Sequence, residues 1–303
     1  MALLLFRVIA ILAYNRIYKI LYKGGENMRI VTLCENRVLS GKLKAMHGLS
    51  LYIEIGEHKY LYDVGQEDIF LSNAKMLNID LKQCEKIIIS HGHYDHASGL
   101  ANIKGLLNKD NFIINKQAFC NKVRLNSNGT IKNIGIGEDA WQLKNLSREI
   151  TGSFQLHKGI WCICNVSLPK ESIRVDKGLY IENQNGTYEL DDFKDEINLA
   201  FETKKGLVVI SGCAHCGVIN ILNEAKRITG VNNIDTFIGG MHLIKASKQE
   251  VSNIAKQLID LKVSRLIVGH CTGVDTISYL KELCGDRIEI IHNYVGLDFN
   301  YLN

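Results

Sequence analysis

The stretch "ISHGHYDHASGL" at residues 89–100 places three histidines and one aspartate within six consecutive positions. It begins where a run of three isoleucines, typical of a buried strand, comes to its end. Alternate residues of an extended chain point to the same side, so His91 and His93 can face together. Asp95 and His96 follow where the chain turns into a predicted helix. Because imidazole and carboxylate groups suit zinc, iron or manganese, the stretch predicts a metal site; a solvated polar loop is the alternative.

Three further histidines lie at or just beyond the ends of predicted strands: His215 in "SGCAH", His242 in "GGMHL" and His270 in "GHCTG". In sheets covered by helices, ligands gather beyond the carboxyl ends of the strands. We therefore expect these histidines to meet the first group at one edge. Asp63, in "LYDVG", ends another strand; it is either a turn residue or an acceptor that fixes a ligating histidine.

Composition limits the class of protein. The 303 residues are 46% hydrophobic, which is enough for a large buried core. The formal charge of +4, from 36 basic and 32 acidic residues, does not suggest nucleic acid as a partner. Nine cysteines without the spacing of a small disulfide scaffold indicate reduced thiols and a cytoplasmic location.

Residues 1–27 form an apolar N-terminal extension that is interrupted by charges. Its uncharged stretches are too short for a stable membrane span. Either translation starts at Met28, or residues 1–22 lie weakly on a membrane surface as a helix. Residues 28–303 are predicted to form a single domain with a variable insertion near 121–159, and the oligomeric state is left open.

From Met28 onward the sequence alternates between strand and helix patterns. The predicted strands are 29–33, 49–55, 59–65, 85–90, 111–115, 159–166, 178–183, 197–203, 206–212, 234–240, 264–270 and 287–293. The predicted helices are 67–79, 98–107, 217–230, 248–261 and 273–283. This order favours an α/β fold in which two mixed β-sheets pack face to face with helices outside.

Several of these motifs together resemble those of the metallo-β-lactamase superfamily. The resemblance covers about residues 28–296, and it implies a four-layer αββα sandwich with a one- or two-metal site at the sheet edge. Within the superfamily, the sequence is similar to the branch named after 7,8-dihydropterin-6-methyl-4-(β-D-ribofuranosyl)aminobenzene-5′-phosphate synthase. The motifs that carry the similarity are "CENR", "HGLSLYIEI", "LYDVGQ", "SHGHYDHASGL", "SGCAHCGVINIL", "GGMHL" and "GHCTG".

The resemblance implies two sets of metal ligands. The ligands of the first metal are His91, His93 and His215. The ligands of the second metal are Asp95, His96 and His270. It also implies that Asp95 orients a metal-bound water, that His242 faces substrate or assists proton transfer, and that Asp63 supports a ligand from behind.

One position departs from the superfamily pattern. Superfamily hydrolases commonly have an aspartate that bridges two metals at the end of the strand where this chain has Cys213. Asp195 or Glu196 could supply the missing carboxylate. Cys213 is expected to support the ligands from behind, as Asp63 does, although either Cys213 or Cys271 could touch a metal, because they flank proposed ligands. Iron-type redox relatives replace the second histidine of the motif by glutamate, whereas this chain keeps His93. The implied cofactor is therefore zinc, as two ions per chain, with iron or manganese as alternatives.

The function expected from these residues is zinc-dependent hydrolysis of a small ester or phosphoester by metal-activated water. The first alternative is a transferase like the dihydropterin synthase, with Trp141, Trp161, Lys170 and Arg174 recognising a pterin and a phosphate. The second is a metal or redox sensor without catalysis. The sequence does not reveal the substrate.

Overall fold

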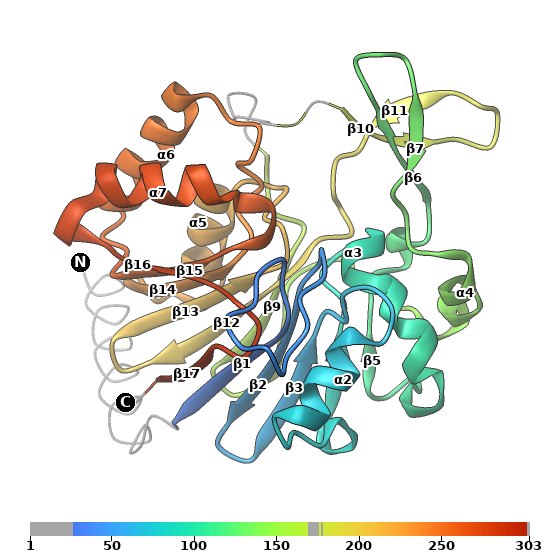
Figure 1. Ribbon diagram of the computed structural model, residues 1–303, viewed down its shortest axis with the longest axis horizontal. Coiled ribbons are helices and arrows are strands. Elements are labelled where there is room, and N and C mark those ends of the chain that lie inside the picture. The colour runs from blue at the N-terminus through green and yellow to red at the C-terminus, as the bar shows by residue number, and fades with distance from the viewer. Residues whose placement is uncertain (1–26, 169–175, 177, 302–303) are drawn as a thin grey trace, which may run out of the picture.

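Two large β-sheets form the centre of the protein (Figure 1). The structure is a computed structural model that describes residues 27–168, 176 and 178–301. The first sheet has the strand order β17 (Asp298–Tyr301), β1 (Met28–Cys34), β2 (Ser50–Ile55), β3 (His58–Tyr62), β4 (Lys86–Ile88) and β5 (Phe112–Ile113). The second has the order β16 (Glu289–His292), β15 (Arg265–Val268), β14 (Ile234–Gly239), β13 (Gly206–Ser211), β12 (Ile197–Thr203), β9 (Ile160–Cys164) and β8 (Phe154–His157).

Both sheets are mixed, and each contains a set of neighbouring parallel strands. In the first sheet, β3, β4 and β5 run parallel. In the second, β13, β14, β15 and β16 run parallel. The carboxyl ends of each parallel set therefore lie along one edge of its sheet.

The two sheets bury a shared hydrophobic core between their inner faces. Tyr62 and Ile88 of the first sheet belong to the same buried cluster as Leu199 and Val208 of the second. The hydroxyl of Tyr62 donates a hydrogen bond to the Ile197 carbonyl at 2.7 Å, which ties the sheets together beneath the site. Area removed from water stabilises such a core by roughly 25 cal/mol per Å².

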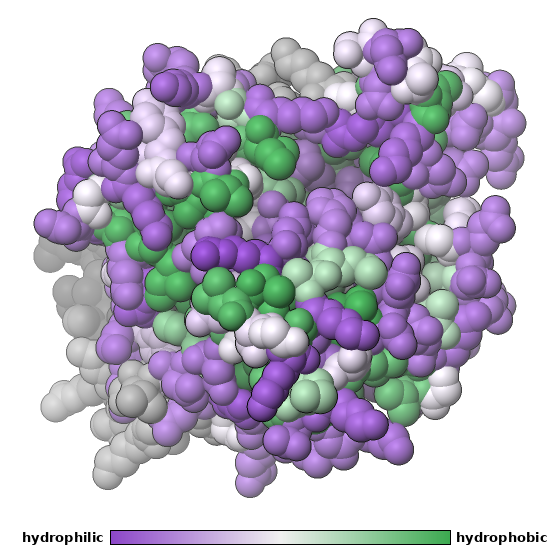
Figure 2. All heavy atoms as spheres, in the orientation of Figure 1, coloured by the Kyte–Doolittle hydropathy of each residue, from purple (hydrophilic) through white to green (hydrophobic). Residues whose placement is uncertain are grey.

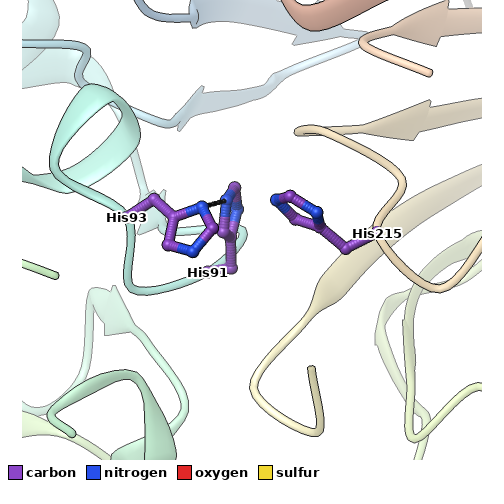
Figure 3. Close-up of side chains that lie close together, drawn as sticks. All are labelled: His91, His93 and His215. Carbon is purple, nitrogen blue, oxygen red and sulfur yellow. Dashed lines mark hydrogen bonds between the residues drawn. The ribbon is translucent and has the colours of Figure 1, made fainter. Parts of the chain in front are cut away.

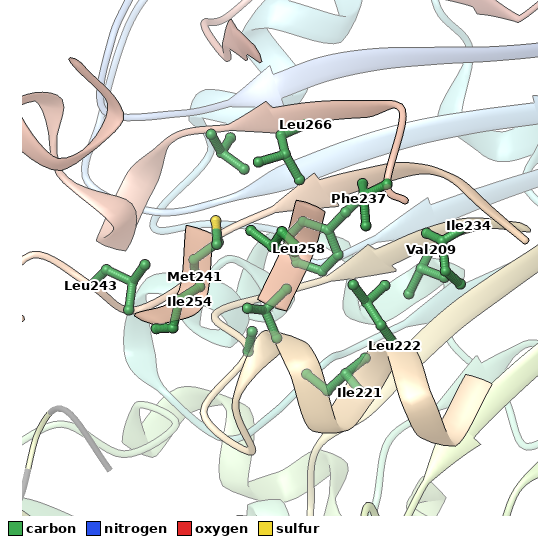
Figure 4. Packing of buried hydrophobic residues seen from close by; sticks show 14 of the residues in the cluster. Val209, Ile221, Leu222, Ile234, Phe237, Met241, Leu243, Ile254, Leu258 and Leu266 are labelled. Carbon is green, nitrogen blue, oxygen red and sulfur yellow. The ribbon is translucent and has the colours of Figure 1, made fainter. Parts of the chain in front are cut away.

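Three helices cover the outer face of the second sheet: α5 (Val218–Thr229), α6 (Lys248–Asp260) and α7 (Val274–Cys284). In α5, Val218, Ile221, Leu222 and Ala225 recur at helical spacing and form the buried stripe. Figure 4 shows Leu222 of α5 and Leu258 of α6 packed against sheet residues such as Phe237.

The outer face of the first sheet is covered in the same way by α2 (Ile69–Met76), the 3₁₀ segment Ser98–Leu106 and α4 (Glu138–Trp141). Phe70 and Leu100 pack there against strand residues such as Leu61 and Ile87. The layers are thus helix, sheet, sheet and helix, so the four-layer αββα fold expected from the sequence is confirmed.

A third, smaller sheet stands beside the sandwich, at the upper right of Figure 1. Its strand order is β11 (Tyr188–Leu190), β10 (Leu179–Glu182), β6 (Asn121–Leu125) and β7 (Ile131–Asn133). Strands β6, β7 and β11 were not predicted, because they have three to five residues and those of β7 and β11 are exposed. The backbone amide of Tyr94 donates a hydrogen bond to the Ile134 carbonyl at 3.0 Å. This part of the 121–159 segment therefore contacts the histidine-rich stretch at residues 91–96.

Hydrophilic side chains cover much of the face seen in Figure 2 and separate the hydrophobic ones into groups. Within the described residues, we find no helix with the length and apolar character needed to cross a membrane. The predicted N-terminal extension lies outside the described residues except for Asn27.

Candidate metal centre

The histidine-rich residues follow the carboxyl ends of strands in both sheets. His91 and His93 follow β4, and the one-turn helix α3 (Tyr94–Ala97) then carries Asp95 and His96. The remaining histidines of the cluster each follow a parallel strand of the second sheet. His215 follows β13, His242 follows β14, and His270 follows β15. The parallel strands of both sheets therefore deliver these side chains to one place, which is the edge where the sheets meet.

The first histidine group consists of His91, His93 and His215 (Figure 3). One ring nitrogen of each lies within 4.8 Å of the others, and His91 Nε2 is 3.0 Å from His93 Nδ1. Burial is the largest cause that lowers the pKa of all three rings well below the usual histidine value. Neutral imidazoles have a free lone pair, which is the state in which histidine binds a metal.

The second ligand group consists of Asp95, His96 and His270. His96 Nε2 lies 3.1 Å from His270 Nε2, and Asp95 Oδ2 lies 3.3 Å from His270 Nε2. Burial alone would raise the pKa of Asp95, but His96 and His270 hold it well below its usual value. The carboxylate is therefore ionised and available as a ligand.

The buried nitrogens of the first group give a test of whether a metal fits. Within the described part of the chain, Nε2 of His93 and Nε2 of His215 are buried and have no hydrogen-bond partner. Buried polar atoms are nearly always satisfied by protein or water. Two nitrogens left free at a cluster of neutral imidazoles fit a bound cation, and nitrogen with oxygen donors suits zinc.

Comparison with known proteins agrees with this geometry. The family model of the metallo-beta-lactamase superfamily matches residues 43–119. A 7,8-dihydropterin-6-methyl-4-(beta-D-ribofuranosyl)-aminobenzene-5'-phosphate synthase from Methanocaldococcus jannaschii is 33% identical, and the match covers 88% of this chain and 95% of that protein. This chain belongs to the metallo-β-lactamase superfamily. Within the superfamily it belongs to the family of that synthase.

Solved structures place the chain in the same superfamily. A metal-dependent hydrolase of the β-lactamase superfamily matches with a TM-score of 0.78 and 30% identity, covering 91% of this chain and all of the other. Zn²⁺-bound PqqB from Methylobacterium extorquens, at 12% identity and a TM-score of 0.51, shares the superfamily fold. Proteins of this superfamily typically bind metal. The two groups of histidine and aspartate side chains described above are therefore the candidate metal-binding residues of this chain.

Asp63 is linked to two of the predicted ligands, His96 directly and His91 through Ser90. Its Oδ2 contacts His96 Nδ1 at 2.7 Å and accepts a hydrogen bond from the Ser90 hydroxyl at 2.7 Å. The Ser90 oxygen in turn lies 2.8 Å from His91 Nδ1. Asp63 has a φ of 58°, a left-handed conformation that costs about 1–3 kcal/mol in a non-glycine residue and is commonly kept at functional sites.

Three more buried carboxylates hold the loops that carry the predicted ligands, and these roles were not predicted from the sequence. Asp195 accepts the Gly92 amide at 2.8 Å. Glu196 accepts the His215 amide at 2.7 Å, and Glu35 accepts the His270 amide. Asp195 and Glu196 are thus engaged with backbone N–H groups, which argues against them as the missing metal-binding carboxylate. All three carboxylates stand at the border of an apolar strand, and this position is the sequence feature by which they could have been found.

Two neighbours extend the site beyond the predicted ligands. His47 Nε2 lies 3.1 Å from Asp95 Oδ2, and the His47 ring is 4.9 Å from that of His270. His242 lies against His215, with ring centroids 4.3 Å apart, and its Nε2 is 3.5 Å from Asp176 Oδ2. Burial alone would lower the pKa of His242, but Asp176 and Cys271 raise it to about 9.

The structure thus brings together all six residues that were predicted to bind metal, while their roles as ligands stay predictions. If both groups bind metal, His96→Ala should lower the metal content from two ions per chain to about one. His96 belongs to the second group, where its Nε2 lies 3.1 Å from His270 Nε2, and it is not one of the three histidines of the first group. The measurement is elemental analysis of protein purified without added metal. An unchanged metal content would contradict a second site that depends on His96.

Proposed function

We propose that this chain is a metal-dependent group-transfer enzyme that joins a dihydropterin to an aminobenzene ribofuranosyl phosphate, as its archaeal relative's name describes. The observation that carries the proposal is the 33% identity to that synthase over nearly the full length of both chains. This favours the transferase alternative over the hydrolysis that the sequence analysis put first. The substrates and products are small molecules in both cases.

The proposed reaction can be written from the product's name. A bond forms between the amine nitrogen of the aminobenzene and the methyl carbon on C6 of the pterin. The bond from that carbon to a leaving oxygen, such as that of a phosphate ester, breaks, and the amine loses a proton. A metal bound at the site would stabilise the negative charge on the leaving oxygen.

The chain's own residues suit the departure of an anion. His242 is kept protonated by Asp176, and it lies beside His215 of the first histidine group. A protonated imidazole can give its proton to the departing oxygen as a general acid. Asp95, held ionised, offers a negatively charged donor to a cation.

The two tryptophans proposed for a pterin pocket do not lie together. Trp141 packs at the border of the core outside the first sheet, and the centroid of its ring lies 6.2 Å from that of Phe119. Trp161 packs against the core outside the second sheet, where its indole donates to Glu202 at 2.8 Å. They therefore do not form one aromatic pocket. Lys170 and Arg174 lie outside the described residues.

Hydrolysis is the second candidate, and the observation in its favour is the 30% identical structure described as a metal-dependent hydrolase. The same site would then use water in place of the amine, with the same leaving oxygen. The substrate class would be the ester or phosphoester expected from the sequence. The two candidates differ only in the nucleophile.

The test is to follow release of the leaving group with and without the amine. The zinc-loaded protein is given a phosphate ester of 6-hydroxymethyl-7,8-dihydropterin, alone or with the aminobenzene ribofuranosyl 5′-phosphate. Transfer predicts release that requires the amine and a condensation product seen by mass spectrometry. Release that is equally fast without the amine indicates hydrolysis. No turnover here or on phosphodiester and ester model compounds would contradict both and favour the sensor hypothesis.

A further inference from the structure

The small sheet turns a basic face toward the candidate metal centre. Arg124 of β6 and Lys132 of β7 stand directly opposite each other in the ladder, so their side chains lie on the same face. Lys132 Nζ lies 5.2 Å from the centroid of the Tyr94 ring, and Tyr94 stands within the histidine-rich stretch at residues 91–96. This face of the small sheet therefore borders the stretch that carries predicted ligands of both metals.

One carboxylate, that of Asp176, joins this face to the opposite side of the site. Its Oδ2 lies 2.8 Å from Arg124 Nη2, 3.3 Å from Lys245 Nζ and 3.5 Å from His242 Nε2. Lys245 belongs to the loop after β14 that also carries His242. Asp176 and His242 line one hollow together with His215, a predicted ligand of the first metal. Arg124 and Lys245 are therefore held at the edge of the candidate metal centre.

Positive charge exceeds negative charge along this edge. Arg124 and Lys245 share the carboxylate of Asp176. Lys132 is exposed and has no carboxylate partner among the residues that the structure describes. Lys122, on the same face of β6, is not counted because two buried carboxylates neutralise it. The remaining groups carry three positive charges and one negative charge, an excess that favours binding of an anion such as phosphate.

We propose that Arg124, Lys132 and Lys245 form the binding site for a phosphate group of the substrate. The inference rests on the proposed function in one respect, which is that both proposed substrates carry phosphate. The planar guanidinium of Arg124 suits a phosphate group, and the two lysines add point charges. Because Asp176 keeps Arg124 close to His242, the expected source is the phosphate ester of the dihydropterin, whose oxygen departs beside His242.

The first test measures binding of inorganic phosphate to the zinc-loaded protein by isothermal titration calorimetry. Arg124→Gln removes a charge-assisted donor and should weaken phosphate binding roughly tenfold. Lys132→Gln changes an exposed side chain and should weaken it roughly threefold. Lys82→Gln is the matched control, because Lys82 is exposed and precedes β4 at the end of that strand opposite the site.

Circular dichroism of each variant separates loss of binding from loss of the fold. Equal phosphate affinity in the wild type, Arg124→Gln and Lys132→Gln would overturn the proposal, as would an equal loss of affinity in Lys82→Gln. Because the titration needs no turnover, its result holds even if the proposed reaction fails.

Steady-state kinetics then identify the substrate whose phosphate is bound. In Arg124→Gln, the KM for the dihydropterin phosphate ester should rise roughly tenfold, while the KM for the aminobenzene ribofuranosyl 5′-phosphate stays unchanged. The opposite pattern would support the phosphate site and assign it to the amine substrate. Unchanged KM values for both substrates would overturn the proposal.

Discussion

A chain carrying both His93→Ala and Asp95→Ala is expected to lose turnover by more than about 100-fold while keeping its fold. Each substitution removes a donor from a different group, so both predicted metals lose a ligand. Loss of even an indirect partner of a metal ligand costs about 10–100-fold, and direct ligands should cost more. Neither side chain belongs to the three hydrophobic clusters that hold the layers together.

The measurement is turnover in whichever of the two assays the wild-type protein supports, together with circular dichroism and thermal unfolding. His157→Ala is the matched control, because His157 lies on β8 and stacks on His58 with ring centroids 3.8 Å apart. That pair is associated with Glu85 and is not part of either ligand group. Activity retained by the double variant would contradict a metal-dependent reaction at this site.

The layers of the fold could be predicted because most elements have a clear apolar period. The buried strands β4 and β13 contain uninterrupted apolar runs, and α5 and α6 show apolar residues on one face. The elements that were missed lack such a pattern. Every residue of β7 and β11 is exposed, so no burial imposes an alternation on their sequence.

The candidate site was predictable in part for a related reason. Histidines at the ends of strands are conspicuous, and parallel strands bring them to one edge. The supporting carboxylates are not conspicuous, because their partners are distant backbone amides. Asp195 binds an amide 103 residues away, and Glu35 one that is 235 residues away. No local spacing encodes such a pairing, so it emerges only from the packed structure.

A further long-range support is the buried ion cluster of Lys122, Asp191 and Asp195. Lys122 is 1% exposed, and its Nζ donates to Asp191 at 2.5 Å and to Asp195 at 3.0 Å. Burial alone would lower the pKa of Lys122, but the two carboxylates raise it above its usual value. The cluster links β6 of the small sheet to Asp195, which also holds the Gly92 amide between two predicted ligands.

Lys122→Met is therefore expected to lower the free energy of unfolding by about 3–5 kcal/mol, because it leaves two buried carboxylates without their cation. Equilibrium unfolding in urea measures this change. Lys194→Met is the control: its ammonium pairs with Asp192 on the surface, where 64% and 42% of the two side chains are exposed. Removing such a pair should cost less than about 1 kcal/mol. Equal effects of the two substitutions would show that the buried cluster does not stabilise the small sheet against the site.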